Sequence, residues 1–98
     1  MQFCAYRLRT GQLVLDMQSD VLSHLKTRLV APLVTESAGD KAMTILEPVL
    51  EMEGERRVLL TTEMVTVPAS LIAGRPVARF TDADYAIRRA LDMLFSGF

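Results

Sequence analysis

The chain has 98 residues, of which 50% are apolar and 23% are charged, and this composition is typical of one small globular domain. Eleven basic and twelve acidic side chains give a net charge of −1. The basic residues are scattered among the acidic ones, which argues against the clustered positive stripe of a nucleic-acid-binding surface. The single cysteine excludes an intrachain disulfide and a cysteine-based zinc site. We therefore expect one domain over residues 1–98, with no metal or other cofactor.

The N-terminal segment lacks the long apolar region of a signal peptide, and no run of about 18 apolar residues follows it. These features predict a soluble, cytosolic protein that does not contact a membrane. The mean hydropathy of +0.23 is high for a monomer of this size. It indicates that a partner or a second copy of the chain covers some apolar surface. Cys4 lies in an apolar run and is expected to be a small buried side chain.

Alternating and β-branched residues predict a series of short strands, separated by turn residues. The predicted strands are residues 3–8, 13–17, 29–34, 48–52, 57–62 and 65–68. Thr10-Gly11-Gln12 forms the first hairpin turn, and residues 53–56 form a four-residue hairpin loop around Gly54. Because Pro32 has no N–H to donate, it is expected to face a sheet edge or a bulge.

The segments between these strands carry further signals. Residues 19–24 are expected to form a loop or a single helical turn with capping chemistry at its front. Residues 37–40 break the strand pattern, and residues 69–73 pair briefly before Gly74-Arg75-Pro76 turns the chain. The pattern as a whole predicts five to seven short antiparallel strands followed by one C-terminal helix, which is a small α+β domain built like a β-barrel.

The last eighteen residues, 81–98, have the pattern of an amphipathic helix. Thr81 is expected to be its N-cap, with acidic residues in the first turn where the helix dipole favours them. Ile87, Ala90, Leu91 and Leu94 recur at helical spacing and predict a stripe that faces the core. Four polar residues follow one another at i+4 on the opposite side and predict an exposed, partly ion-paired row. These are Asp84, Arg88, Asp92 and Ser96.

The chain ends in Ser96-Gly97-Phe98, next to a second aromatic residue, Phe95. The pattern alone favours an end in which Phe95 and Phe98 fold back onto the core. The alternative is that this end is a contact tip for a partner.

Few side chains suggest catalysis. His24 is expected to be a solvated loop residue, and Asp16 and Asp20 are expected to have capping or surface roles. The chain has no glycine-rich phosphate loop and no GxSxG or HExxH motif. A metal-free ribonuclease can nevertheless work with arginine, threonine and glutamate alone. Such groups are present as Arg57, Thr61, Thr62 and Glu63, so the pattern leaves both an enzyme and a binding module open.

Three stretches together resemble the CcdB family of toxins. The first is Met1-Gln2-Phe3 with Tyr6, followed by LVLDMQSD at residues 13–20, which matches the family pattern (F/L)VDVQSD. The second is RLVAPL at residues 28–33, which matches R-x-V-(I/A)-P-L. The third is TTEMVTVP at residues 61–68, which matches TT-(D/E)-M-x-(S/T)-V-P. The chain also ends where the family has a tip of a hydrophobic residue, glycine and a second hydrophobic residue.

The resemblance implies a small SH3-like antiparallel β-barrel of the CcdB–MazF type with one C-terminal α-helix, assembled as a symmetric homodimer. It implies a bacterial, cytoplasmic toxin of a type II toxin–antitoxin system, which is not an enzyme. Such a toxin binds the A subunit of DNA gyrase and, as a topoisomerase poison, traps the complex with cleaved DNA. A CcdA-like antitoxin neutralises it with a disordered segment that folds on binding. The toxin–antitoxin complex represses its own operon, and nucleic acid is bound only in that complex.

The resemblance also implies site residues, and it reverses the preference for a C-terminal end folded onto the core. The gyrase-binding residues are Asp92, Phe95, Ser96, Gly97 and Phe98. The overlapping antitoxin-binding residues are Gln2, Phe3, Ser19, Val21, Leu22 and Phe98. Ser96 departs from the family prototype, which has a tryptophan that stacks on a gyrase arginine. Loss of such a contact costs about 1–3 kcal/mol, and Phe98, in place of a branched aliphatic residue, is expected to recover part of it.

Two other functions remain as alternatives. The first is an mRNA interferase of the MazF/Kid type on the same barrel fold, which requires arginine with threonine or aspartate in a basic cleft. The second is a non-toxic protein that binds the antitoxin as a decoy.

Overall fold

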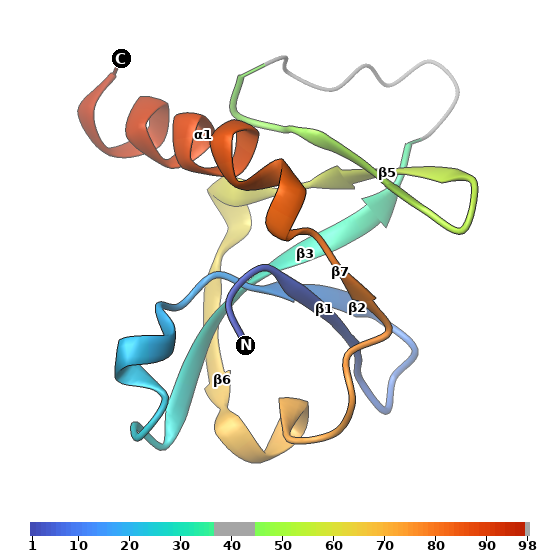
Figure 1. Cartoon of the computed structure of the whole chain (residues 1–98), viewed down its shortest axis with the longest axis vertical. Coiled ribbons are helices and arrows are strands. Elements are labelled where there is room, and N and C mark those ends of the chain that lie inside the picture. The colour runs from blue at the N-terminus through green and yellow to red at the C-terminus, as the bar shows by residue number, and fades with distance from the viewer. Residues whose placement is uncertain (37–44, 98) are drawn as a thin grey trace.

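The computed structural model describes residues 1–36 and 45–97, and this part of the chain forms seven strands and one α-helix (Figure 1). The strands are β1 (Cys4–Arg7), β2 (Leu13–Asp16), β3 (Thr27–Thr35), β4 (Val49–Met52), β5 (Glu55–Leu59), β6 (Val65–Pro68) and β7 (Ala78–Arg79). The helix α1 spans Asp84–Ser96. Four 3₁₀ turns complete the described part, namely η1 (Asp20–Leu22), η2 (Thr61–Glu63), η3 (Ala69–Ile72) and η4 (Thr81–Ala83). The predicted α+β class is confirmed.

The strands form one antiparallel sheet in the order β4-β5-β3-β2-β1-β7, with β6 paired to β3. The nine-residue β3 is the centre of this sheet, because it pairs with β2 on one side and with β6 and then β5 on the other. This double pairing curves the sheet into a nearly closed barrel. In Figure 1, α1 lies across the top of the barrel, and η3 lies at the opposite end.

Two apolar clusters lie on opposite faces of the sheet, because successive side chains of a strand point to opposite faces. In β2, Leu13 and Leu15 belong to the cluster under α1, whereas Val14 belongs to the cluster near η3. All four side chains of β2 are therefore buried. Cys4 is also buried, as predicted, and belongs to the second cluster.

Pro32 lies where β3 changes partner. Residues 27–30 pair with β6, and residues 33–35 pair with β5. The Pro32 carbonyl accepts a hydrogen bond from Leu60 N at 2.9 Å, so it points to the side of β3 where β6 and β5 lie. In a β-strand, the N–H and C=O of one residue point to the same side. The N–H that Pro32 lacks would therefore point to the junction between the β3–β6 pairing and the β3–β5 pairing. The sequence predicts that Pro32 faces a sheet edge or a bulge. It lies instead in the central strand, where it pairs with Val14 of β2 and its other side faces the junction between the β6 and β5 pairings.

The β4–β5 hairpin is tighter than predicted. Met52 pairs with Glu55, so the loop contains only Glu53 and Gly54, and the predicted four-residue loop is wrong. Both residues have positive φ, 54° and 80°, which is the requirement of a type I′ turn. A glutamate rarely adopts a positive φ, so the sequence does not by itself indicate a two-residue loop here.

Two predicted strand segments are 3₁₀ turns instead. The predicted strand 57–62 corresponds to β5, which ends at Leu59 and is followed by η2. The predicted brief pairing of residues 69–73 is wrong, because this segment forms η3 and buries Ile72. The predicted break at residues 37–40 lies outside the described residues.

The C-terminal helix begins later than predicted. Residues 81–83 form η4, the N-cap of α1 is Ala83, and no side chain caps the helix, so the predicted Thr81 cap is wrong. The predicted inner stripe is confirmed at Ile87 and Ala90, which are 0% exposed, and at Leu91, which packs against the core, whereas the fourth predicted member, Leu94, is only partly buried. In the predicted polar row, Arg88 Nε donates to Asp84 Oδ1 at 2.8 Å.

Candidate functional site

The N-terminal turn, residues 1–3, places Phe3 between β2 and α1 and Gln2 beside η1. Phe3 N donates to Asp16 O at 2.6 Å, and Phe80 N donates to Phe3 O at 2.8 Å. These bonds hold Phe3 at a φ of 61°, in the left-handed region that non-glycine residues rarely adopt. The Phe3 ring is only 2% exposed, so it supports the surface from below, whereas Gln2 is half-buried.

The 3₁₀ turn η1 presents two apolar side chains to solvent. The Ser19 hydroxyl accepts a hydrogen bond from Val21 N at 3.3 Å and caps this turn, which confirms the predicted helical turn with capping chemistry. Val21 is 82% exposed and Leu22 is 42% exposed. Gln2 N donates to Asp20 Oδ1 at 2.9 Å, so η1 and the N-terminal turn are directly joined. These two segments contain all of the predicted antitoxin-binding residues except Phe98.

A buried ion pair lies beneath this surface. Asp16 is 0% exposed, and its Oδ2 accepts hydrogen bonds from two nitrogens of Arg28, Nη2 and Nε, the latter at 3.2 Å. The N-terminal ammonium of Met1 lies 3.0 Å from the same oxygen and also donates to the Tyr6 hydroxyl at 2.9 Å. Burial raises the pKa of the Tyr6 phenol, and the nearby Cys4 and Asp16 add to this rise.

The predicted surface role is wrong for Asp16, which is buried. The predicted capping role agrees with its Oδ1, which accepts a hydrogen bond from Gln18 N. Asp20 does lie at the surface and accepts from Gln2 N. The Asp16–Arg28 pair could not be predicted from the sequence, because its partners are twelve residues apart and meet only through the pairing of β2 with β3.

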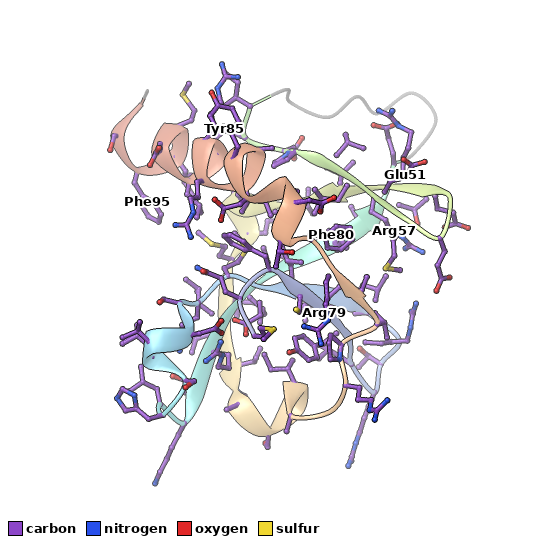
Figure 2. The ribbon with its side chains drawn as sticks, viewed as in Figure 1. Glu51, Arg57, Arg79, Phe80, Tyr85 and Phe95 are labelled. Carbon is purple, nitrogen blue, oxygen red and sulfur yellow. The ribbon has the colours of Figure 1, made fainter. Side chains whose placement is uncertain are left out.

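The end of α1 carries the predicted gyrase-binding residues. Phe95 is 72% exposed, so the end folded back onto the core, which the pattern alone favours, is wrong for this residue. Asp92 and Ser96 are also exposed, and Gly97 ends the helix in the left-handed conformation with a φ of 79°. In the view of Figure 2, Tyr85 projects above the start of α1 and Phe95 projects below its end. Phe98 lies outside the described residues.

Arg88 links the two parts of the site. Its guanidinium carbon lies 5.4 Å from the centre of the Phe3 ring, within the range of a cation–π contact. Asp92 and Phe95 follow Arg88 by one and two helical turns. The N-terminal turn is therefore joined to η1 by the Gln2–Asp20 hydrogen bond and to α1 by the Arg88–Phe3 contact. From this contact, α1 continues toward its exposed end.

The groups considered for catalysis lie in different environments. His24 is exposed in a turn, as predicted. Thr61 is 1% exposed, and its hydroxyl donates to the carbonyl of Leu46. Arg57 of β5 donates to Thr35 Oγ1 of β3 at 3.2 Å and to Glu55 Oε2 of β5 at 3.1 Å. Among residues 1–36 and 45–97, no cluster of three or more histidine, cysteine or acidic side chains is placed to hold a metal ion.

The fold is a small α+β barrel with exposed apolar side chains on η1 and at the end of its helix. A family model described as CcdB protein matches residues 2–97, and the chain therefore belongs to the CcdB family, the toxins of toxin–antitoxin systems. Within the described residues, no helix has the length and apolar character needed to cross a membrane.

Proposed function

We propose that the protein is a toxin that binds the A subunit of DNA gyrase and traps the enzyme on cleaved DNA. The observation that carries this proposal is the contrast along α1. Ile87 and Ala90 anchor the helix in the core, whereas Phe95 stands 72% exposed beside Ser96 and Gly97. A large apolar side chain left exposed on a rigid helix is typical of a residue that anchors a protein–protein contact. Membership of the CcdB family supports the same conclusion.

The toxin acts by binding, as a homodimer in the bacterial cytoplasm, and not by catalysis. A CcdA-like antitoxin neutralises it by folding a disordered segment over Gln2, Phe3, η1 and the helix end. The exposed Val21 and Leu22 support this assignment, because such a segment gains affinity by covering apolar surface. The toxin–antitoxin complex then represses its own operon.

A gyrase cleavage assay with the purified protein tests the proposal. The wild-type protein is expected to accumulate cleaved DNA, and removal of the last three residues or Gly97→Arg is expected to abolish this effect without unfolding the protein. Ser96→Trp is expected to increase potency about tenfold to a hundredfold, because it restores an aromatic stacking partner. Cleaved DNA that accumulates equally with the truncated protein would contradict the proposal, and RNA cleavage would favour an interferase.

Tyr85→Ala provides a matched control for the helix end. Tyr85 is 78% exposed on the same helix, but it lies at the start of α1, ten residues before Phe95 (Figure 2). Phe95→Ala is expected to weaken the gyrase effect, whereas Tyr85→Ala is expected to leave it unchanged. Equal losses in both variants would show that the helix contributes apolar surface without a defined contact site.

A further inference from the structure

The loop that carries η1, residues 19–26, has no fully buried side chain. None of the three residues of η1 is buried. The loop makes hydrogen bonds within itself, from Leu22 N to Ser19 O at 3.0 Å, from Ser23 N to Asp20 O at 3.1 Å and from Leu25 N to Leu22 O at 3.1 Å. These bonds define the shape of the loop but not its orientation. Polar contacts to the rest of the protein therefore help to set the direction in which Val21 and Leu22 point, and one of them is the hydrogen bond from Gln2 N to Asp20 Oδ1.

The Gln18 side chain makes several of these contacts. Its Nε2 donates to Leu22 O at 3.2 Å and to Thr27 O at 3.3 Å, and its Oε1 accepts from Leu29 N at 3.2 Å. One amide thus ties η1 to the start of β3 across the base of the loop. Two donors and an acceptor are needed at this position, and a carboxylate of the same length supplies only the acceptor.

The backbone of Gln18 is held in turn by the buried ion pair. Gln18 N donates to Asp16 Oδ1 at 3.1 Å, and Arg28 Nη2 donates to Gln18 O at 3.4 Å. Asp16 is 0% exposed and Arg28 is 5% exposed, so water does not compete freely for these contacts. Gln18 therefore has a fixed backbone below the surface and a side chain that reaches outward to the loop.

We infer that Gln18 is a positioning residue for partner binding, which holds the η1 loop in the orientation that presents Val21 and Leu22. This inference rests on the proposed function, because it names the residue that orders part of that binding surface. The advantage for affinity is preorganisation, since a loop that is ordered before binding loses less entropy when the partner binds. The outer edge of the loop then makes the contacts, and Gln18 acts only through it.

The test combines loop order with binding. We expect Gln18→Ala to lower the backbone ¹⁵N order parameters of Val21, Leu22 and Leu25 from about 0.85 to about 0.6 or less, and to leave those of β3 unchanged. We also expect it to weaken binding to a peptide of the disordered segment of the CcdA-like antitoxin about tenfold, mainly through faster dissociation. Gln12→Ala, at an exposed glutamine in the β1–β2 turn, is the matched control and should change neither quantity.

Two further variants separate positioning from contact and from folding. Val21→Ala should weaken binding without lowering the order parameters of the loop, because it removes a contact only. Gln18→Glu keeps the acceptor for Leu29 N but loses both donors, so it should loosen the loop. It tests the same role if Gln18→Ala does not fold.

Unchanged order parameters in a folded Gln18 variant would overturn the inference, as would a disordered loop with wild-type affinity. If the wild-type protein does not bind the antitoxin peptide, the proposed neutralisation by an antitoxin fails and the role of Gln18 in binding fails with it. The order parameters would then show separately whether Gln18 orders the loop.

Discussion

The buried carboxylate of Asp16 accepts hydrogen bonds from several donor groups. Its carboxylate accepts hydrogen bonds from Arg28, from Gln18 N and from the N-terminal ammonium, and none of its surface is exposed. A buried carboxylate is tolerated only when its charge and its lone pairs are matched in this way. Since Arg28 is also buried, each member of the pair depends on the other.

Asp16→Ala is expected to lower the free energy of unfolding by about 3–5 kcal/mol, because the buried Arg28 guanidinium loses its nearest counter-charge and keeps only the exposed Asp20, whose Oδ1 lies 4.0 Å from Nη2. Urea denaturation at fixed protein concentration measures this change. Asp84→Ala is the control, since it breaks the exposed ion pair with Arg88 and should cost about 1 kcal/mol or less. Equal losses in the two variants would contradict the structural role of the buried pair.

Tyr6 predicts a loss of stability in alkaline solution. Burial raises the pKa of its phenol above the ordinary value of 10.0. Between that value and the raised pKa, the unfolded chain has released the phenol proton while the folded protein keeps it, so the free energy of unfolding falls as the pH rises. Below about pH 10 this contribution is fully retained.

Tyr6→Phe is expected to make the decline in the free energy of unfolding above pH 10 less steep, because the variant has no proton to lose. Denaturant titrations at several alkaline pH values measure the slope, and Tyr85→Phe at an exposed tyrosine is the control. A slope that is the same in wild type and Tyr6→Phe would show that Tyr6 ionises equally in both states.

At the scale of secondary structure, the β4–β5 hairpin contains a residue poorly suited to its backbone. Glu53 has a φ of 54°, whereas asparagine is preferred before glycine in a type I′ turn. Glu53→Asn is therefore expected to raise the free energy of unfolding by about 0.5–1 kcal/mol. Gly54→Ala should lower it by about 1 kcal/mol, although the added Cβ meets no atom within 4 Å, because φ is 80°. Thermal denaturation of both variants checks the two opposite signs, and a loss of stability in both would contradict the turn assignment.

The helix α1 predicts different roles for its two sides. Ile87→Ala is expected to cost about 2–5 kcal/mol of unfolding free energy, because Ile87 is 0% exposed in the core. Phe95→Ala should change it by less than about 0.5 kcal/mol, since its side chain is 72% exposed. Chemical denaturation measures both. A large loss for Phe95→Ala would indicate that this residue stabilises the fold and is not reserved for a partner.

The elements that could be predicted from the sequence are those with a regular period. The inner stripe of α1 followed from the spacing of Ile87 and Ala90, and most strands followed from alternation. The start of α1 and the length of the β4–β5 loop could not be predicted, because they depend on a 3₁₀ turn and on a positive φ at Glu53. Local propensity carries little information about either.

The candidate site was less accessible from pattern than the fold. Periodicity favoured a buried Phe95, and the resemblance to a family was needed to expect it at the surface. Gln18 belongs to the QSD part of the recognised motif, but its role depends on contacts with Thr27 and Leu29, which the β2–β3 connection brings near. A single sequence does not show such contacts, because they join residues about ten positions apart.

At the scale of the whole molecule, exposed apolar side chains remain outside the proposed gyrase and antitoxin sites. Val65 is 50% exposed, Leu71 is 47% exposed and Val77 is 44% exposed. Together with the high mean hydropathy, they favour the proposed homodimer, in which a second copy covers apolar surface.

If the protein is an obligate homodimer, its stability must depend on its own concentration, because two folded chains form one native particle. Each tenfold increase in protein concentration is then expected to stabilise the dimer by about 1.4 kcal/mol, which raises the thermal midpoint. Thermal denaturation over a hundredfold concentration range, with light scattering to give the mass of the native particle, measures both quantities. A midpoint that does not move, with the mass of a single chain, would show that the exposed apolar side chains are solvated in a stable monomer.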